Sequence, residues 1–228
     1  INIINGYMRK KKITFGLRRR VRKYLEYIWE EGKSQNQEEV TEIISSLSDS
    51  LKENLLLEAN GKSLRHMKML MKNFSEEVLR RTVFIMKEER LMPGDMIFGK
   101  DDYHDSSLYL IRKGEVNVVF LTKDTDPADY NVLRKLQRGE VFGDKAFFTG
   151  RPRTFEVVSA DFTTLYKIDR KEFLKILEDF PTDKETFHLI KTQLERSDHT
   201  KLHTKCRSCS RTDHSLDLCP WLHCKFIK

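Results

Sequence analysis

The segment from Gly139 to Thr154 carries the residues best suited to bind an anion. It contains a glycine turn at Phe142-Gly143-Asp144, and the turn leads into a short predicted helix. The first N–H groups of a helix have no partners within it, so they can face a negatively charged group. Arg153 follows, and a guanidinium can donate two parallel hydrogen bonds to phosphate oxygens, which a lysine cannot do. The segment therefore predicts a site for one compact anion rather than for a polymer.

A second group of reactive side chains lies near the end of the chain, where all four cysteines fall between Cys206 and Cys224. A disulfide framework would spread cysteines through the fold, so this clustering favours a metal site in a reducing compartment. Three of the cysteines and one histidine have the Cys-x2-Cys-x4-His-x4-Cys spacing of a retroviral-type zinc knuckle. Three thiolates and one imidazole form a tetrahedral set that suits zinc. We therefore expect Zn to be bound by Cys206, Cys209, His214 and Cys219.

The cysteine cluster also has other interpretations. Asp213 stands where such knuckles usually place Gly, and Cys224 could replace Cys219 or remain a spare thiol beside His223. All four cysteines could be reduced structural thiols. Zinc knuckles often bind single-stranded nucleic acid through stacked bases. Trp221 offers little aromatic surface for that purpose, so a structural cap on the domain is the favoured interpretation.

Composition excludes some classes of protein and leaves others open. The 228 residues suit one full domain with a smaller helical unit, and a hydrophobic fraction of 39% is enough for a packed core. The net charge of +7 permits an anionic ligand, a nucleic acid or an anionic membrane surface. No apolar run approaches the ~18 residues of a spanning helix and no signal peptide is visible, so we expect a soluble piece of a larger protein. His66, His104 and His188 have no nucleophile or metal partner in the sequence, and we expect no enzymatic activity.

Hydrophobic periodicity divides the chain into helices, then strands, then helices. Apolar residues recur at helical spacing from Leu17 to Ile28, from Val40 to Leu47 and from Leu51 to Leu56, where Asn60-Gly61 offers a stop. Ser75 followed by two glutamates predicts a helix N-terminus. Four strands are predicted near residues 108–111, 116–120, 155–158 and 163–168, with a polar loop over 122–130 and later helices at 171–177 and 182–195. This order predicts an α+β fold.

The segment Gly139–Thr154 resembles the phosphate-binding cassette of cyclic-nucleotide-binding domains, which reads F-G-E-x-x-L and then R-T-A. Phe142-Gly143-Asp144 and Arg153-Thr154 match that pattern. The preceding residues Pro93-Gly94-Asp95, Leu108–Ile111 and Lys113–Val116 fit the strands that lead into the cassette. The resemblance implies a jelly-roll-like β-roll with flanking helices, and it implies cAMP or cGMP as the ligand.

The same resemblance implies roles for individual residues. Arg153 would pair with the cyclic phosphate, and the backbone of Gly143, Asp144 and Ala146 would line the phosphate and ribose. The Asp144 side chain would accept a hydrogen bond from the ribose 2′-hydroxyl, and Thr154 could contact the phosphate or a guanine. The last helix would close over the base, with apolar packing from its final turn. The expected nucleotide site comprises Leu136, Phe142, Gly143, Asp144, Lys145, Ala146, Arg153, Thr154, Phe155 and Leu194.

Three positions depart from the pattern of that family. Asp144 is one methylene shorter than the usual Glu, Lys145 replaces an apolar residue, and Phe155 replaces a small Ala. Some channels of the EAG type keep this fold and bind nucleotide poorly or not at all. In the corresponding alternative, Arg153 pairs with an internal carboxylate such as Asp144, and the domain acts as a fixed gating lever.

Residues Arg20 to Trp29 are similar to the C-linker of hyperpolarization-activated, cyclic-nucleotide-gated and EAG-type channels, in which an R-V-R-x-Y-x-x-Y-x-W pattern follows the pore-lining helix. The resemblance implies a helical C-linker over residues 1–74, a cyclic-nucleotide-binding domain over 75–199 and the zinc knuckle over 200–228. It implies the cytoplasmic ligand-sensing and gating module of a voltage-gated cation channel, with potassium as the expected ion. The partners would be a pore domain of the same chain and, in the full channel, three further copies in a homotetramer.

Two other partners are possible for a chain with this positive net charge: an anionic lipid surface and a nucleic acid. The basic run Arg18–Lys23 could meet anionic lipid headgroups, although a charge run can also be a solvated face. A nucleic-acid-binding protein that uses the zinc knuckle is the remaining alternative function, and nucleic acid is not the favoured partner.

Overall fold

The computed structural model describes residues 2–32, 46–100, 102, 106–120, 131–196, 206, 209, 211 and 219–223. The chain forms two compact units, Ile1–Asn54 and Leu55–Lys228. None of the helices in the described ranges is both long enough and apolar enough to cross a bilayer. The domain boundaries expected from the resemblance remain predictions.

The first unit contains a pair of helices joined by a tight turn. Helix α1 spans Asn2–Lys10, and helix α2 spans Phe15–Gly32 and includes the first predicted helix. The chain reverses between them because Lys12 adopts a left-handed backbone with φ 51°. The Ile13 N–H donates to the Met8 carbonyl at 3.0 Å and closes the turn. The predicted helix from Val40 to Leu47 falls mainly on residues 33–45, which lie outside the described residues.

Helices also lead into the second unit. Helix α4 spans Asp49–Leu64, so the predicted stop at Asn60-Gly61 is wrong. An interior Gly costs a helix only ~1 kcal/mol relative to Ala, and the burial of Leu64 beyond it, at 3% exposed, outweighs that cost. Helices α5 (Lys68–Met71) and α6 (Glu76–Ile85) follow. The Ser75 hydroxyl accepts from the Val78 N–H at 3.5 Å, which confirms the predicted N-terminus of α6.

The strands form two antiparallel four-stranded sheets that face one another as a β-roll. One sheet has the order β1-β8-β3-β6 and the other the order β2-β7-β4-β5. The four predicted strands are present as β3, β4, β7 and β8, whereas the other four were not predicted. The loop expected over 122–130 lies outside the described residues. The strands span Lys87–Leu91 (β1), Met96–Phe98 (β2), Leu108–Lys113 (β3), Glu115–Phe120 (β4), Asn131–Gln137 (β5), Val141–Phe142 (β6), Glu156–Ser159 (β7) and Thr163–Ile168 (β8).

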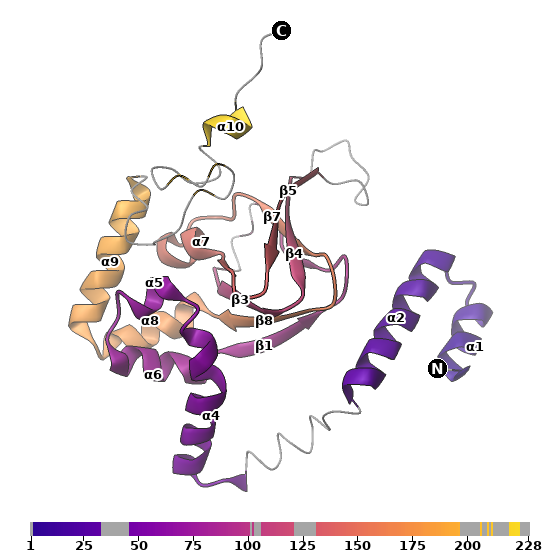
Figure 1. The fold of residues 1–228 in the computed structure, drawn as a ribbon, viewed down its shortest axis with the longest axis horizontal. Coiled ribbons are helices and arrows are strands. Elements are labelled where there is room, and N and C mark those ends of the chain that lie inside the picture. The colour runs from indigo at the N-terminus through magenta and orange to yellow at the C-terminus, as the bar shows by residue number, and fades with distance from the viewer. Residues whose placement is uncertain are drawn as a thin grey trace. The chain divides into compact units, whose positions relative to one another are not determined.

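Two hydrophobic cores hold the second unit together. The inner core lies between the sheets and includes Tyr109, Val118, Phe142 and Leu165. The outer core joins helices to the β-roll through buried residues such as Phe147, Phe173, Phe187 and Leu194. Its helices include α7 (Asp144–Thr149), α8 (Arg170–Glu178) and α9 (Pro181–Glu195). Figure 1 shows α5, α6 and α8 gathered beside the β-roll, with α9 next to them. The predicted α+β fold with a β-roll and flanking helices is confirmed.

Candidate ligand-binding site

The cassette begins where strand β6 turns sharply into helix α7. Gly143 makes this turn in a left-handed conformation with φ 87°. A Cβ at this position would lie 2.7 Å from both Arg153 Nη1 and the Ser107 carbonyl oxygen. Glycine is therefore required at this position for two reasons: the left-handed backbone angle and the close approach of neighbouring atoms. Because the chain reverses here, the first N–H groups of α7 follow directly after the turn.

Arg153 is buried beside this turn, with 4% of its surface exposed. Its Nη1 donates to the Gly143 carbonyl at 3.0 Å, and its Nη2 donates to the Ser107 carbonyl at 2.7 Å. The guanidinium carbon lies 4.0 Å from the centre of the Phe98 ring, within the range of a cation–π interaction. Within the described part of the chain Arg153 is not paired with Asp144, and its described contacts include two carbonyl oxygens and an aromatic face.

The inner core supplies an apolar floor next to the guanidinium. Leu136 and Phe142 are buried at 0% and 1% exposed, and Phe155 packs partly buried against the same core. Phe142 stacks on Tyr109 with the ring centres 5.1 Å apart. The β-roll thus brings together a buried cation and apolar side chains, a combination that suits an amphipathic anion such as a nucleotide.

The remaining cassette residues differ in accessibility. Asp144 and Lys145 are half-buried in the first turn of α7, whereas Ala146 is buried at 4% exposed. Thr154 is exposed directly after Arg153. Asp144 and Thr154 can therefore reach a ligand with their side chains, and Ala146 can contribute only through its backbone.

Sequence reasoning missed Ser107 and Phe98 as parts of this site. Ser107 acts through its main-chain carbonyl, which any residue type could supply, so its sequence position carries no signal. Phe98 ends the short strand β2 and could have been found only by pairing that strand with β7. Both residues lie far from Arg153 along the chain, and only the fold places them against it.

Comparison with known proteins agrees with this geometry. Residues 88–180 match the family model of the cyclic nucleotide-binding domain. That range contains the whole cassette, together with Ser107 and Phe98, which contact Arg153 from outside the cassette. The matched domain thus covers most of the β-roll, the cassette and helix α8.

The chain is also similar to several channel proteins over a longer range. Cyclic nucleotide-gated channel beta-3 of Mus musculus is 28% identical over 184 residues, which is 79% of this chain and 25% of that protein. A cyclic nucleotide-gated channel of Caenorhabditis elegans is 25% identical over 184 residues, or 78% of this chain and 24% of that protein. Cyclic nucleotide-gated channel alpha-3 of Homo sapiens is 25% identical over 190 residues, or 81% of this chain and 26% of that protein. The chain thus spans about a quarter of the length of these relatives.

Helix α9 lies outside the matched domain but packs on its cassette. Phe187 of α9 meets Phe148 of α7 with ring centres 5.3 Å apart, and it also contacts Phe147. Leu194 is 4% exposed and belongs to the outer core, whereas Leu136 and Phe142 belong to the inner core. The structure therefore does not bring Leu194 together with the residues around Arg153.

A buried carboxylate fixes the start of α9, and sequence reasoning missed it. Asp183, with 8% of its surface exposed, accepts hydrogen bonds from the Ser75 N–H at 2.8 Å and the Ser75 hydroxyl at 2.7 Å. The residue that caps α6 is thereby bonded to α9, 108 positions away. Helices α6, α7 and α9 form one connected group.

Three cysteines near the end of the chain meet in space. The Sγ atoms of Cys206, Cys209 and Cys219 all lie within 4.8 Å of one another. Cys206 and Cys219 are buried and Cys209 is half-buried. The Cys206 N–H donates to the Arg211 carbonyl. His214 and Cys224 lie outside the described residues.

Proposed function

We propose that the chain is the ligand-sensing and gating module of a cyclic-nucleotide-regulated cation channel and that it binds cAMP or cGMP at the cassette. The observation that carries this proposal is the buried Arg153 guanidinium, held at the turn into α7 inside a segment that matches the cyclic nucleotide-binding domain. The names of the similar proteins support the channel assignment. The pore belongs to the full channel, which we expect to be an integral membrane homotetramer with this module at the cytoplasmic face of the membrane.

The cassette can recognise each part of a cyclic nucleotide. A guanidinium has five N–H donors in one plane, and the two bonds to carbonyl oxygens fix its orientation before the ligand arrives. The cyclic phosphate would meet Arg153 and the N–H groups at the start of α7. Asp144 would accept from the ribose 2′-hydroxyl, and Lys145 adds positive charge close to the phosphate. Phe155, which is only partly buried against the inner core, would contact the ribose and base, while Leu136 and Phe142 would support it from within that core.

Discrimination between the two nucleotides would depend on Thr154 and on backbone groups. Leu194 is buried in the outer core, so it would give a base no hydrogen bond, and apolar contacts distinguish adenine from guanine weakly. We therefore expect cAMP and cGMP to differ in affinity by about tenfold at most, or ~1.4 kcal/mol. We expect potassium to be the permeant ion because Arg20–Trp29 is similar to the linkers of potassium-selective and related channels.

Ligand binding would reach the rest of the protein through the helices that pack on the cassette. A shift of α7 moves Phe147 and Phe148 against Phe187, and the Asp183–Ser75 bonds connect α9 to α6. Met67, Leu70 and Phe74 continue the same outer core towards α4. Coupling of this kind typically amounts to ~1–3 kcal/mol, enough to shift a gating equilibrium.

Calorimetry on the purified chain tests the proposal against its alternatives. Titration with cAMP or cGMP should release or absorb heat that saturates at one site per chain. Heat from neither nucleotide would favour a gating domain that has lost nucleotide binding. Binding of a short single-stranded oligonucleotide in place of both nucleotides would favour the nucleic-acid alternative.

We also propose that Cys206, Cys209 and Cys219 hold a zinc ion, with His214 as the fourth ligand from its spacing. A tetrahedral zinc with Zn–S bonds of ~2.3 Å separates its sulfurs by about 3.8 Å, and the three sulfurs lie close enough to form one face of such a site. Zinc would hold the tail folded where apolar burial alone is too small, because binding energy then replaces a core.

Metal analysis tests the zinc proposal. The purified chain should contain about one zinc per molecule, and Cys209→Ser or His214→Ala should lower that content by at least half. Cys224→Ser is the matched control and should leave the zinc content unchanged. A loss of zinc in Cys224→Ser with retention in Cys219→Ser would instead identify Cys224 as the third thiolate. A metal-free chain would contradict the proposal.

A further inference from the structure

The net positive charge of the protein is concentrated in one short segment. Residues 1–25 contain nine Lys or Arg and no Asp or Glu. The remaining 203 residues contain 33 Lys or Arg and 35 Asp or Glu, which gives them a net charge of −2. The excess of +7 therefore belongs entirely to helix α1, the turn and the first part of α2. Such an asymmetry indicates a surface that meets a negatively charged partner.

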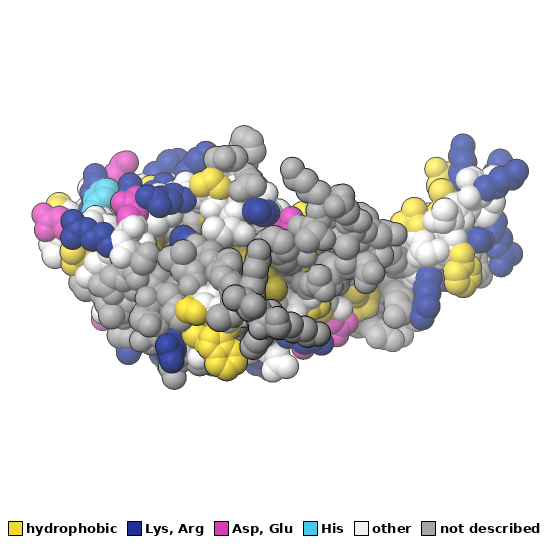
Figure 2. All heavy atoms as spheres, turned by 90° about the horizontal axis from the view of Figure 1, so that it is seen from above, with side chains coloured by type: hydrophobic (Ala, Val, Ile, Leu, Met, Phe, Trp, Pro, Cys, Tyr) yellow, Lys and Arg dark blue, Asp and Glu magenta, His cyan; other side chains and the backbone are white. Residues whose placement is uncertain are grey.

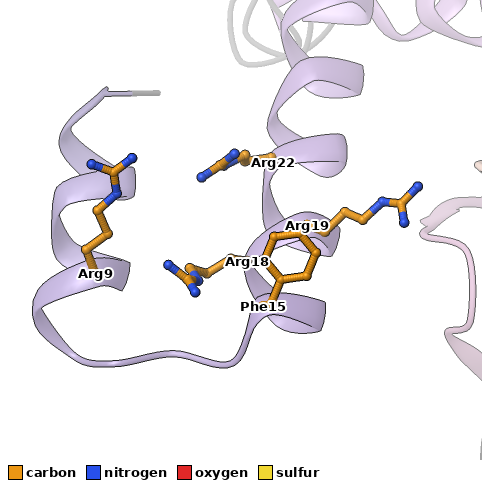
Figure 3. Close-up of a pocket in the computed structure, with 5 residues that line it drawn as sticks. All are labelled: Arg9, Phe15, Arg18, Arg19 and Arg22. Carbon is orange, nitrogen blue, oxygen red and sulfur yellow. The ribbon is translucent and has the colours of Figure 1, made fainter.

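Four arginines of this segment form one pocket with an aromatic side chain. Phe15, Arg18, Arg19 and Arg22 stand at i, i+3, i+4 and i+7 of α2 and so share one face of the helix. With Arg9 of α1 they line a pocket of about 520 Å³. Figure 3 shows Arg18 and Arg22 reaching from α2 towards α1, where Arg9 stands, with the Phe15 ring beside them.

The arrangement is electrostatically unfavourable without a ligand. Like charges at i, i+3 and i, i+4 on a helix repel one another, and Arg18, Arg19 and Arg22 form such pairs. Among the described side chains, none of the arginines in the pocket is paired with a carboxylate. Arg22 Nε donates to the Asn5 amide oxygen at 2.9 Å, which orients its guanidinium. Arg18 Nε is buried without a hydrogen-bond partner in the described part of the chain.

Apolar exposure around the arginines distinguishes a membrane from a nucleic acid. Phe15 is 74% exposed, Tyr7 56% and Leu17 48%. Figure 2 shows yellow apolar side chains beside dark blue Lys and Arg side chains over this part of the surface. Basic and apolar side chains together on one helical surface are typical of segments that lie in the interface of an anionic membrane. Guanidinium groups suit phosphate esters because they donate in pairs.

We propose that the pocket between α1 and α2 binds the phosphorylated headgroup of an anionic membrane lipid. Arg9, Arg18 and Arg22 contact the phosphate oxygens, and Phe15 enters the acyl region next to the headgroup. Multiply phosphorylated inositol lipids fit best, since three guanidinium groups converge on one pocket. This binding does not depend on the nucleotide site.

Vesicle co-sedimentation of the purified chain tests this proposal. The vesicles contain phosphatidylcholine alone, or phosphatidylcholine with phosphatidylserine or with phosphatidylinositol bisphosphate. The variant Arg18→Gln/Arg22→Gln removes two charges from the pocket, and the control Lys10→Gln/Lys11→Gln removes two charges outside it. The pocket variant should lose about tenfold or more in partitioning to the inositol-lipid vesicles, and the control should lose less than about threefold. Phe15→Ala should weaken vesicle binding and leave the binding of soluble inositol trisphosphate unchanged.

Several results would overturn the proposal. Equal losses in the two double variants would show a diffuse charge effect without a site. Binding of soluble inositol trisphosphate with no binding to any vesicle would assign the pocket to a free phosphate ligand. Tighter binding of a single-stranded oligonucleotide than of inositol-lipid vesicles would assign the surface to nucleic acid. Unchanged far-ultraviolet circular dichroism in each variant excludes unfolding as the cause of a loss.

Discussion

Replacing Arg153 with Ala should weaken both the fold and the binding of nucleotide. The guanidinium donates two hydrogen bonds to main-chain carbonyls and lies 4.0 Å from the centre of the Phe98 ring. Hydrogen bonds to charged groups contribute ~1.5–3 kcal/mol each, and a desolvated cation–π contact about 2 kcal/mol. Removing the buried cation also removes its desolvation cost, which offsets part of this sum. We expect the free energy of unfolding to fall by ~3–4 kcal/mol, within the range of the more damaging point substitutions.

Urea unfolding followed by circular dichroism measures this loss. Arg151→Ala is a matched control, because Arg151 lies two positions away with 59% of its side chain exposed and reaches Glu195 at 3.7 Å. An exposed ion pair of this kind contributes ~0.2–1 kcal/mol, so the control should lose less than about 1 kcal/mol. If Arg153→Ala lowered the free energy of unfolding by no more than Arg151→Ala does, the proposed contribution of these contacts to stability would be refuted.

Nucleotide titration of the same variants separates the structural role of Arg153 from its role as a ligand. At a temperature where Arg153→Ala is folded, its affinity for cAMP should fall by at least ~2 kcal/mol, because the phosphate loses a charged donor. Arg153→Lys should retain part of the stability, since it keeps the charge, but it loses the planar pair of donors. Unchanged cAMP affinity in folded Arg153→Ala would remove Arg153 from the phosphate site.

Three further predictions concern the turn and the helices around it. Gly143→Ala should lower the free energy of unfolding by ~2–4 kcal/mol, and Gly139→Ala by only ~1–2 kcal/mol. Both glycines have φ 87°, but only at Gly143 would a new Cβ lie 2.7 Å from other atoms. Equal losses of stability in urea unfolding would show that the structure relieves this close contact. Asp183→Ala should lower the free energy of unfolding by ~2–3 kcal/mol, since the Ser75 N–H and the proton of the Ser75 hydroxyl lose their acceptor. Asp179→Ala, at a side chain that is 62% exposed, should lower it by less than ~1 kcal/mol. Saturating nucleotide should slow hydrogen exchange in α9 more than in α4, and equal protection would mean that α9 does not respond to the ligand.

The helix cap and the glycine turn were predictable because the interactions that define them join residues close together in the sequence. A cap such as Ser75 bonds to an N–H three residues away, so its sequence position is informative. The glycine turn and Arg153 stand ten residues apart and form a recognisable pattern, although the pattern cannot say what holds the arginine. The α+β order likewise follows from changes in hydrophobic period along the chain.

Strand β1 shows why some elements were missed. Its sequence Lys-Glu-Glu-Arg-Leu has no alternation of apolar and polar residues, because it is an edge strand with much of its surface exposed. It exists as a strand because β8 pairs with it along its whole length, and Lys167 of β8 bonds to Glu89 at 3.2 Å. That partner lies about eighty residues further along the chain, beyond any local pattern.

What the sequence by itself determined is the set of groups available for chemistry: a guanidinium after a glycine turn, clustered thiols and a basic N-terminal segment. Only the tertiary structure decided which groups meet. It placed the Ser107 carbonyl and the Phe98 ring against Arg153, bonded Asp183 to Ser75, and kept Leu194 in the outer core. The physical reason is that carbonyl oxygens, ring faces and buried carboxylates act at a few ångströms. Distance along the chain does not report such proximity until the sheets and helices have packed.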